Sequence, residues 1–188
     1  MCDPYDFTSD TPMPAIAFPG QRSCDVVRPI SKLLKDEAKS IENFEALMAL
    51  GNLANLNESV RGRMLKDSDC VMCIENYMYQ EHQLLRRASV QCVLNLCQSE
   101  KQVKRFEEKN DKMKYMVLLM GDADDTEVVK AAAGAVATLT SYSTALCKKV
   151  YDSSQWESCF LNVLCSQVKP PPLYNISTSY HHSPLTGL

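Results

Sequence analysis

Proline and glycine are almost missing from the middle of this 188-residue sequence. All nine prolines lie at or before Pro29 or at or after Pro170, and only four of the six glycines lie between these positions. β-Sandwiches and α/β domains place both residues in many turns. A proline inside a helix breaks its backbone hydrogen bonds at a cost of about 3 kcal/mol. The long proline-free stretch therefore predicts an all-α core.

The sequence also lacks long hydrophobic runs and an excess of positive charge. Apolar runs such as Met116–Met120 are far shorter than the ~20 residues that span a bilayer. The acidic N-terminus, MCDPYDFTSD, has no apolar signal-peptide region. The net charge of −3 does not suit binding by neutralisation of nucleic-acid phosphates. We therefore expect a globular protein with no membrane segment and no nucleic-acid partner.

Nine cysteines are present, an odd number, and several lie in apolar helical patterns. Without a secretory signal, we expect reduced thiols in the cytoplasm that pack as small hydrophobic side chains. The Cys70-Val71-Met72-Cys73 segment has the spacing of half a zinc site. It has no second pair at ligand spacing, and His82 is the only histidine of the core, so core packing is the favoured interpretation. We expect no metal and no cofactor.

An apolar–polar–Leu element occurs three times, and its anchor residues Leu53, Leu96 and Leu139 are 43 residues apart. Apolar residues recur three before and seven after each anchor, which we interpret as one helical face. A helical period of 43 lies within the ~40–47 residues of armadillo and HEAT units. The sequence therefore predicts an armadillo/HEAT-like α-solenoid of about three repeats. The recurring apolar residues are Leu50, Val93 and Val136 before the anchors and Val60, Val103 and Leu146 after them.

The two flanks differ from this core. Residues 1–17 carry three prolines and are predicted to be a flexible arm, while the Pro/Ser/Thr/His-rich residues 169–188 are predicted to be disordered. Residues 18–168 then form the repeat domain. Asp122, Asp124 and Asp125 supply an N-cap and negative charge to the helix that follows them. The expected helices besides the anchor segments are 24–34, 70–78, 112–120, 126–146 and 156–165.

Solenoids bind extended partners along the concave surface that the last helix of each repeat lines. The polar residue directly before each anchor, Asn52, Asn95 or Thr138, is a candidate for bonding the backbone of a bound peptide. The alternative is that Asn52 and Asn95 only bond neighbouring helices. Glu75 is expected to pair with Arg86 or Arg87 for structural reasons.

Five segments in order resemble the UCS-domain myosin chaperones: FPGQR (18–22), FEALMALGNLA (44–54), IENYM (74–78), LLRRASVQCVLNL (84–96) and AAAGAVATLT (131–140). The resemblance implies a cytosolic armadillo-repeat protein that binds the myosin motor domain, assists its folding and serves muscle development. It implies partner contacts at Phe18, Phe44, Asn52 and Asn95. Metazoan members also carry a tetratricopeptide region that docks the heat-shock chaperone, and a central region. Neither is recognisable here, so we expect a fragment, a short isoform or an incomplete gene model.

Two readings compete with this one. Asp122-Ala123-Asp124-Asp125-Thr126 matches the D-x-D-x-T motif of haloacid-dehalogenase-like phosphotransferases, but that chemistry requires a parallel sheet, and here an alanine-rich helix follows. No other catalytic arrangement stands out, so we predict that the chain is not an enzyme. The second reading is a generic armadillo adaptor with a non-myosin client. The single tryptophan, Trp156, is not on a third helix, which disfavours a receptor for basic peptides.

Overall fold

The computed structural model describes residues 22–167, so Phe18, the predicted arm 1–17 and the predicted tail 169–188 lie outside the described residues. Between residues 22 and 167 the chain forms eleven helices and no β-strand, which confirms the predicted all-α class. Across the same residues, no helix combines the length and hydropathy needed to cross a membrane.

The helices follow one another in groups of three. The first group comprises a short α1 (Arg22–Asp25), α2 (Val27–Leu33) and α3 (Ser40–Leu56). The next two groups are α4 (Glu58–Lys66), α5 (Ser68–Tyr77) and α6 (Gln83–Leu96), then α7 (Glu100–Glu107), α8 (Lys112–Leu119) and α9 (Thr126–Tyr142). The chain continues into α10 (Thr144–Tyr151) and α11 (Trp156–Gln167).

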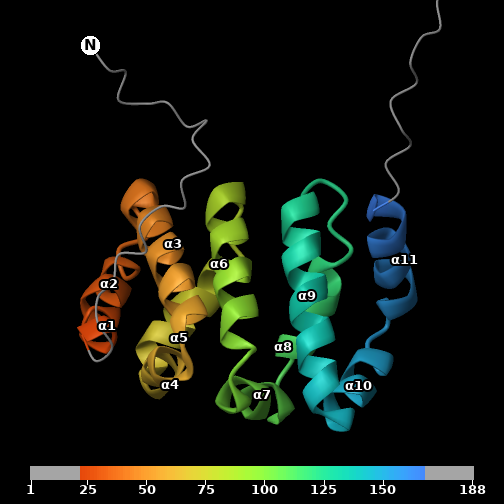
Figure 1. Cartoon of the computed structure of the whole chain (residues 1–188). Helices are drawn as coiled ribbons and strands as arrows, with labels where there is room; N and C mark the ends of the chain where they lie inside the picture. Colours follow the sequence, from red (N-terminus) through yellow and green to blue (C-terminus); the bar gives the residue numbers. More distant parts are fainter. Residues whose placement is uncertain (1–21, 168–188) are drawn as a thin grey trace, which may run out of the picture.

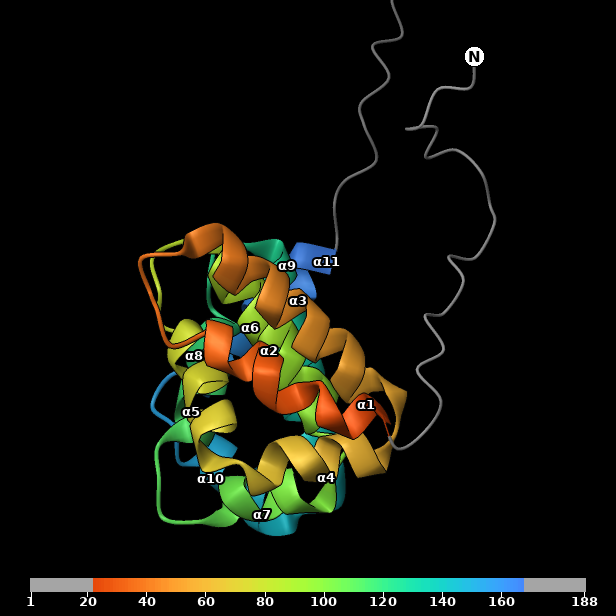
Figure 2. The same cartoon turned by 90° about the vertical axis from the view of Figure 1, so that its left-hand side faces the viewer.

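The three long helices form one layer of the molecule. In Figure 1, α3, α6 and α9 stand side by side, and their mutual contacts are the most extensive in the structure. Figure 2 looks along the stack, with α4, α7 and α10 along its lower edge and α5 and α8 along another side. Each repeat is therefore roughly triangular in section, and the repeats stack as an α-solenoid, as predicted.

The repeat positions found in the sequence form the core. Leu50, Val93 and Val136 are buried, as are the anchors Leu96 and Leu139, while Leu53 is half-buried. The predicted single face is wrong in one respect, because the residues seven after each anchor lie on the next short helix. Val60, Val103 and Leu146 are buried on α4, α7 and α10 respectively. Extended backbone at the residue between the helices causes this change of direction, as at Asn57 and Ser143.

Two predicted helices differ from those of the structure. The helix expected over 126–146 ends at Tyr142, because Ser143 adopts an extended conformation and a new helix begins at Thr144. The helix expected over 24–34 is divided at Val26 into α1 and α2. The predicted helices 70–78, 112–120 and 156–165 are found within two residues of those bounds as α5, α8 and α11.

Side chains one repeat further along the chain satisfy the carbonyl groups at helix C-termini. Tyr77 donates its hydroxyl to the carbonyl of Leu34 at 3.1 Å, and Asn162 donates its amide to the carbonyl of Met120 at 2.8 Å. Lys149 Nζ likewise donates to the carbonyl of Phe106 at 2.7 Å. Terminal carbonyls have no partner within their own helix, so these bonds stabilise both the helix ends and the stacking of the repeats.

Ion pairs also join consecutive repeats, and one prediction about them is wrong. Glu75 on α5 pairs with Lys112 at 2.8 Å and with Arg105 at 3.5 Å, rather than with Arg86 or Arg87. The prediction failed because these side chains extend in different directions. Glu75 faces α7 and α8, whereas the two arginines of α6 reach the loop before α9. Arg86 pairs there with Asp122 at 3.4 Å and Arg87 with Asp125 at 2.7 Å.

Candidate protein-binding surface

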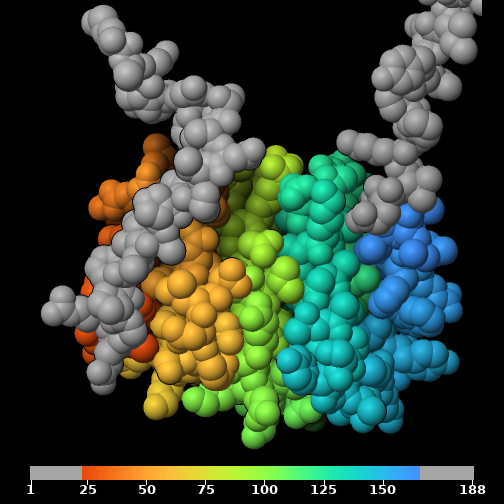
Figure 3. Space-filling model, viewed as in Figure 1, coloured from red at the N-terminus to blue at the C-terminus, as the bar shows by residue number. Residues whose placement is uncertain are grey.

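The exposed face of α3, α6 and α9 is a regular surface that the repeats create, because these long helices pack side by side. We call it the third-helix face. Equivalent positions lie 43 residues apart, so each row across the face contains one residue from each helix. Figure 3 shows α3 in orange, α6 in yellow-green and α9 in teal, side by side on the side facing the viewer. The rows through its middle are Met48, Gln91 and Gly134, then Asn52, Asn95 and Thr138.

Asn95 is engaged in a contact between two of these helices. Its amide Nδ2 donates to the backbone carbonyl of Gly51 on α3 at 2.9 Å, and its side chain is half-buried. Gly51 lies so close to α6 that an added Cβ atom would sit 3.8 Å from Cys92. Asn95 therefore does what the alternative interpretation predicted, bonding a neighbouring helix and fixing the spacing of α3 and α6.

Asn52 occupies the equivalent position on α3 but differs from Asn95 in its exposure and hydrogen bonding. Its side chain is exposed and makes no hydrogen bond within residues 22–167. Thr138, the third member of the row, bonds the carbonyl of Gly134 in its own helix at 2.8 Å. Asn52 is thus the member of this row whose side-chain donors and acceptor remain available to a partner.

Phe44 is only partly available. It lies on α3 with a half-buried ring that packs against the hydrophobic core, so part of it contributes to stability. Eight residues separate it from Asn52, a rotation of about 80° around the helix, so its ring lies at the edge of the exposed stripe and not at its centre. The structure places Asn52 and Asn95 in one row of the third-helix face, with the Asn95 amide engaged by Gly51 and Phe44 at the edge of the face, and Phe18 lies outside the described residues.

The sequence reasoning missed the exposed apolar side chains on the third-helix face, among them those of Ile41, Met48, Leu56 and Leu84. Ile41 and Met48 on α3 and Leu84 on α6 are 77%, 47% and 46% exposed. Ile41 and Met48 lie on the same side of α3 as Asn52, since residues 7 and 11 apart return to one helical face. Ile41 and Leu84 are themselves 43 residues apart, so the repeat period was the signal that marked them. Exposed apolar rows beside a free amide suit a protein segment that offers both apolar side chains and backbone groups.

The acidic cluster before α9 has structural partners. Asp125 is fully buried, accepts from the backbone N–H of Val128 at the start of α9, and accepts from Arg87 Nε at 2.7 Å. Desolvation raises the pKa of the Asp125 carboxyl. The hydrogen bonds from Arg87 and Val128 and the charge of Arg87 together lower this pKa by more, so the net shift is downward. Asp122 accepts from the backbone N–H groups of Asp124 and Asp125. The predicted N-cap is thus confirmed at Asp125.

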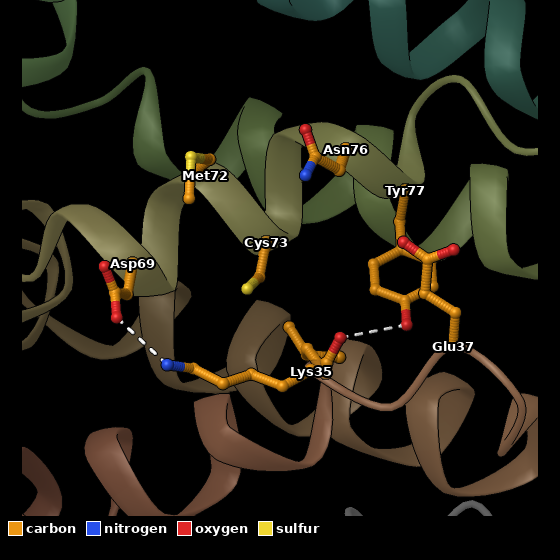
Figure 4. Close-up of a pocket in the computed structure, with 8 residues that line it drawn as sticks. Lys35, Glu37, Asp69, Met72, Cys73, Asn76 and Tyr77 are labelled. Atoms are coloured by element: carbon orange, nitrogen blue, oxygen red, sulfur yellow. Dashed lines mark hydrogen bonds and ion pairs between the residues drawn. The ribbon is translucent and has the colours of Figure 1, made fainter.

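A pocket of about 270 Å³ lies between α5 and the segment that follows α2, which contributes Leu34, Lys35 and Glu37 (Figure 4). Lys35 and Asp69 form an exposed ion pair of 3.0 Å at one end, and the Tyr77 hydroxyl bonds Leu34 at the other. Cys73 points between them, and burial, partly opposed by the charge of Lys35, raises the pKa of its thiol. A protonated thiol is a poor nucleophile, so the pocket has the character of an interface between repeats.

The cysteines of the described part of the chain are all unpaired. Burial raises the pKa of Cys70 to about 12 and also raises the pKa values of Cys92 and Cys97. Within residues 22–167, no three His, Cys, Asp or Glu side chains are grouped to hold a metal ion. The thiols pack as apolar side chains in the core.

No protein-family model matches the sequence. Protein unc-45 homolog B of Danio rerio is 43% identical to it over 159 residues, which are 84% of this chain and 17% of that protein. A solved structure of UNC-45 from Drosophila melanogaster is 43% identical in sequence and has a TM-score of 0.73. The match covers 85% of this chain and 20% of the Drosophila chain.

A second solved structure concerns molecular features of the UNC-45 chaperone critical for binding and folding muscle myosin. It is 31% identical with a TM-score of 0.72, and the match covers 80% of this chain and 17% of that one. The chain thus spans a fifth or less of the length of these relatives. Within that span the similarity in sequence and in structure confirms the resemblance predicted from the residues.

Proposed function

We propose that this chain, which is homologous to one segment of the UNC-45 proteins, holds a segment of the myosin motor domain against its third-helix face. The observation that carries the proposal is the similarity to an UNC-45 structure described by its binding and folding of muscle myosin. The chain shares the helical solenoid over most of its length with that structure and with the Drosophila protein.

The chemistry of the third-helix face supports this role. Ile41, Met48 and Leu84 offer exposed apolar area, and the free amide of Asn52 offers hydrogen bonds to the backbone of a bound segment. We propose Asn52 as the main polar contact, with Phe44 supporting the shape of α3 and with Asn95 and Phe18 as further contacts. An unfolded motor segment exposes both apolar side chains and unpaired backbone groups, so it matches this combination.

The proposed mechanism requires no nucleotide and no covalent step. A client segment held on the face is removed from the pool of aggregation-prone molecules by mass action. We further propose that the chain is not an enzyme. Supporting this, Asp122, the first carboxylate of the D-x-D-x-T match, is paired with Arg86 and accepts from two backbone N–H groups, and the raised pKa of the Cys73 thiol makes it a poor nucleophile.

We propose the cytoplasm as the place of action. The unpaired cysteines of the described helices suit a reducing compartment, in which thiols stay free. Contact with the heat-shock chaperone is proposed only through a region of the family that this sequence does not resemble.

A pull-down with a purified myosin motor domain tests the proposal. Met48→Ala/Asn52→Ala changes two exposed residues four apart on α3, and Met72→Ala/Asn76→Ala makes the same two changes on an exposed side of α5. We expect the α3 variant to bind about tenfold more weakly, a loss of ~1.4 kcal/mol, and the α5 control to bind like the unmodified chain. Circular dichroism verifies that both remain helical.

Equal binding by the two variants would refute the third-helix face as the binding site. A folded, unmodified chain that does not bind the motor domain would refute the myosin assignment and favour an adaptor with another client.

A further inference from the structure

The last group of helices, which we call the fourth repeat, contains the equivalents of the first two helices of a repeat, α10 and α11. The position of its third helix can be derived from the repeat period. α9 begins at Thr126, so one period of 43 residues places the start of an equivalent helix at residue 169. The sequence from that point has Pro170, Pro171 and Pro172 and a further proline at 184. Prolines inside a helix break its hydrogen bonds, so this stretch lacks the sequence pattern of the seventeen-residue helix α9.

The side of α11 that a third helix would cover is apolar and open among the described residues. Ile74 on α5 and Val117 on α8 are buried at the equivalent positions, whereas Phe160 on α11 is 38% exposed. Leu161 and Leu164 beside it are 60% and 65% exposed. Ala137 on α9, equivalent to the half-buried Leu94 of α6, is exposed as well.

A cluster of three aromatic side chains extends this surface. The ring of Trp156 lies between those of Tyr151 and Phe160, at centroid distances of 5.9 Å and 6.0 Å. We call Trp156, Phe160, Leu161 and Leu164 the α11 face. Surfaces lined by aromatic rings receive extended, proline-rich segments, because such segments lose little conformational entropy on binding.

We propose that residues 169–185 of this same chain cover the α11 face in an extended conformation and replace the missing third helix. The segment follows α11 directly, so it is tethered beside the surface at an effective concentration on the order of millimolar. The twelve residues of α11 span roughly 18 Å, and an extended chain covers that length with about six residues. The segment is therefore long enough to return along the whole helix.

The pattern of the segment fits one-sided packing. Tyr174, Ile176, Thr178 and Tyr180 alternate with Asn175, Ser177 and Ser179. In an extended chain, alternate side chains point to opposite sides, so Tyr174, Ile176 and Tyr180 fall on one side and the small polar residues on the other. This inference rests on the repeat geometry and does not depend on myosin binding.

Trp156 is the only tryptophan of the sequence and reports directly on the α11 face. We would compare the full chain with Tyr174→Asp/Ile176→Asp and with the control Asn175→Asp/Ser177→Asp, which adds the same charge on the opposite side. We expect the first variant to shift Trp156 emission to longer wavelength and to increase its quenching by acrylamide. The control should match the unmodified chain, and circular dichroism should be the same for all three.

The receiving side provides a second measurement. Leu164→Asp should reproduce the emission shift, and combining it with Tyr174→Asp/Ile176→Asp should add little, because both changes remove the same contact. Identical emission and quenching in all variants would overturn the proposal and leave the α11 face open to a partner. Emission that depends on protein concentration, together with dimers in sedimentation, would overturn it in favour of a second copy.

Discussion

Asn52 and Asn95 show how two residues at equivalent repeat positions acquire different roles. Asn95 has a neighbouring long helix on the side where its amide points, and it bonds the Gly51 carbonyl. Asn52 lies on the first long helix of the described chain and is exposed there. Repeat membership therefore identifies the position of a polar side chain, whereas the presence of a neighbour decides whether that side chain stabilises the stack.

This difference gives a prediction about stability. Asn95→Ala should lower the free energy of unfolding by about 1 kcal/mol, because a half-buried hydrogen bond to α3 is lost. Asn52→Ala should change it by less than about 0.5 kcal/mol, as for other exposed positions. Urea denaturation followed by circular dichroism measures both, and equal losses in the two variants would contradict the assignment of Asn95 to the α3–α6 contact.

Asp125 gives a prediction that depends on pH. Asp125→Ala removes the charge-assisted bond to Arg87 and the cap of α9, and should cost about 2–4 kcal/mol at pH 7. The pKa of Asp125 is lowered in the folded chain, so its stabilisation is fully present above the ordinary value near 3.8 and is lost as the pH falls through the lowered value. The difference between variant and unmodified chain should therefore shrink towards pH 3.

The neighbouring Asp124 provides the control for this experiment. Its side chain is exposed, and Asp124→Ala should change the free energy of unfolding by no more than about 0.5 kcal/mol at either pH. A cost for Asp125→Ala that stays constant between pH 7 and pH 3 would contradict a stabilising role of the ionised carboxylate.

At the scale of helices, the contact between α2 and α5 depends on one buried hydroxyl. Tyr77→Phe removes the bond to the Leu34 carbonyl, which lies at the C-terminal end of α2. We expect a loss of about 1–2 kcal/mol, because the carbonyl loses its partner, and an increase in hydrogen exchange over the unmodified chain that is larger in α2 than in α6. Tyr79→Phe is the matched control, since the Tyr79 ring is half-exposed and contacts Tyr115 through its ring. Equal effects of the two changes would contradict this role of Tyr77.

The helices themselves were largely predictable from the sequence, for reasons visible in single residues. Apolar spacing at Leu50, Val93 and Val136 marked the buried sides of α3, α6 and α9, because burial follows the helical period. The break at Ser143 was not predicted, because apolar residues continue across it into α10 and no proline or glycine marks the turn. The partners of Glu75 were not predictable either, since they depend on the direction in which neighbouring repeats present α7 and α8.

The candidate site was predictable to a lesser extent than the fold. The period located Asn52 and Asn95 on third helices, but it did not reveal that Asn95 is engaged by Gly51 or that Phe44 packs against the core. Exposure is a property of the assembled layer, so the period could mark Ile41 and Leu84 as equivalent apolar positions but could not show that these side chains and that of Met48 are exposed.

At the scale of the whole molecule, contacts join neighbouring repeats only, as in other solenoids. α6 packs against a long helix on each side, α3 and α9, whereas α2 and α11 lie towards the two ends of the described stack. Hydrogen exchange should therefore be slowest in α6 and progressively faster towards α2 and α11. Mass spectrometry of exchanged peptides measures this order, and uniform protection across the helices would contradict it.

The contacts between successive long helices also determine how the molecule responds to a pulling force. Because every repeat touches only the next, tension applied at the two ends passes through each interface in turn, as through links connected in series. Such a chain yields first at its weakest link, and the packing of α6 against α9 is less extensive than that of α3 against α6. A client that changes shape while bound across all three long helices would therefore separate α6 from α9 before it separates α3 from α6.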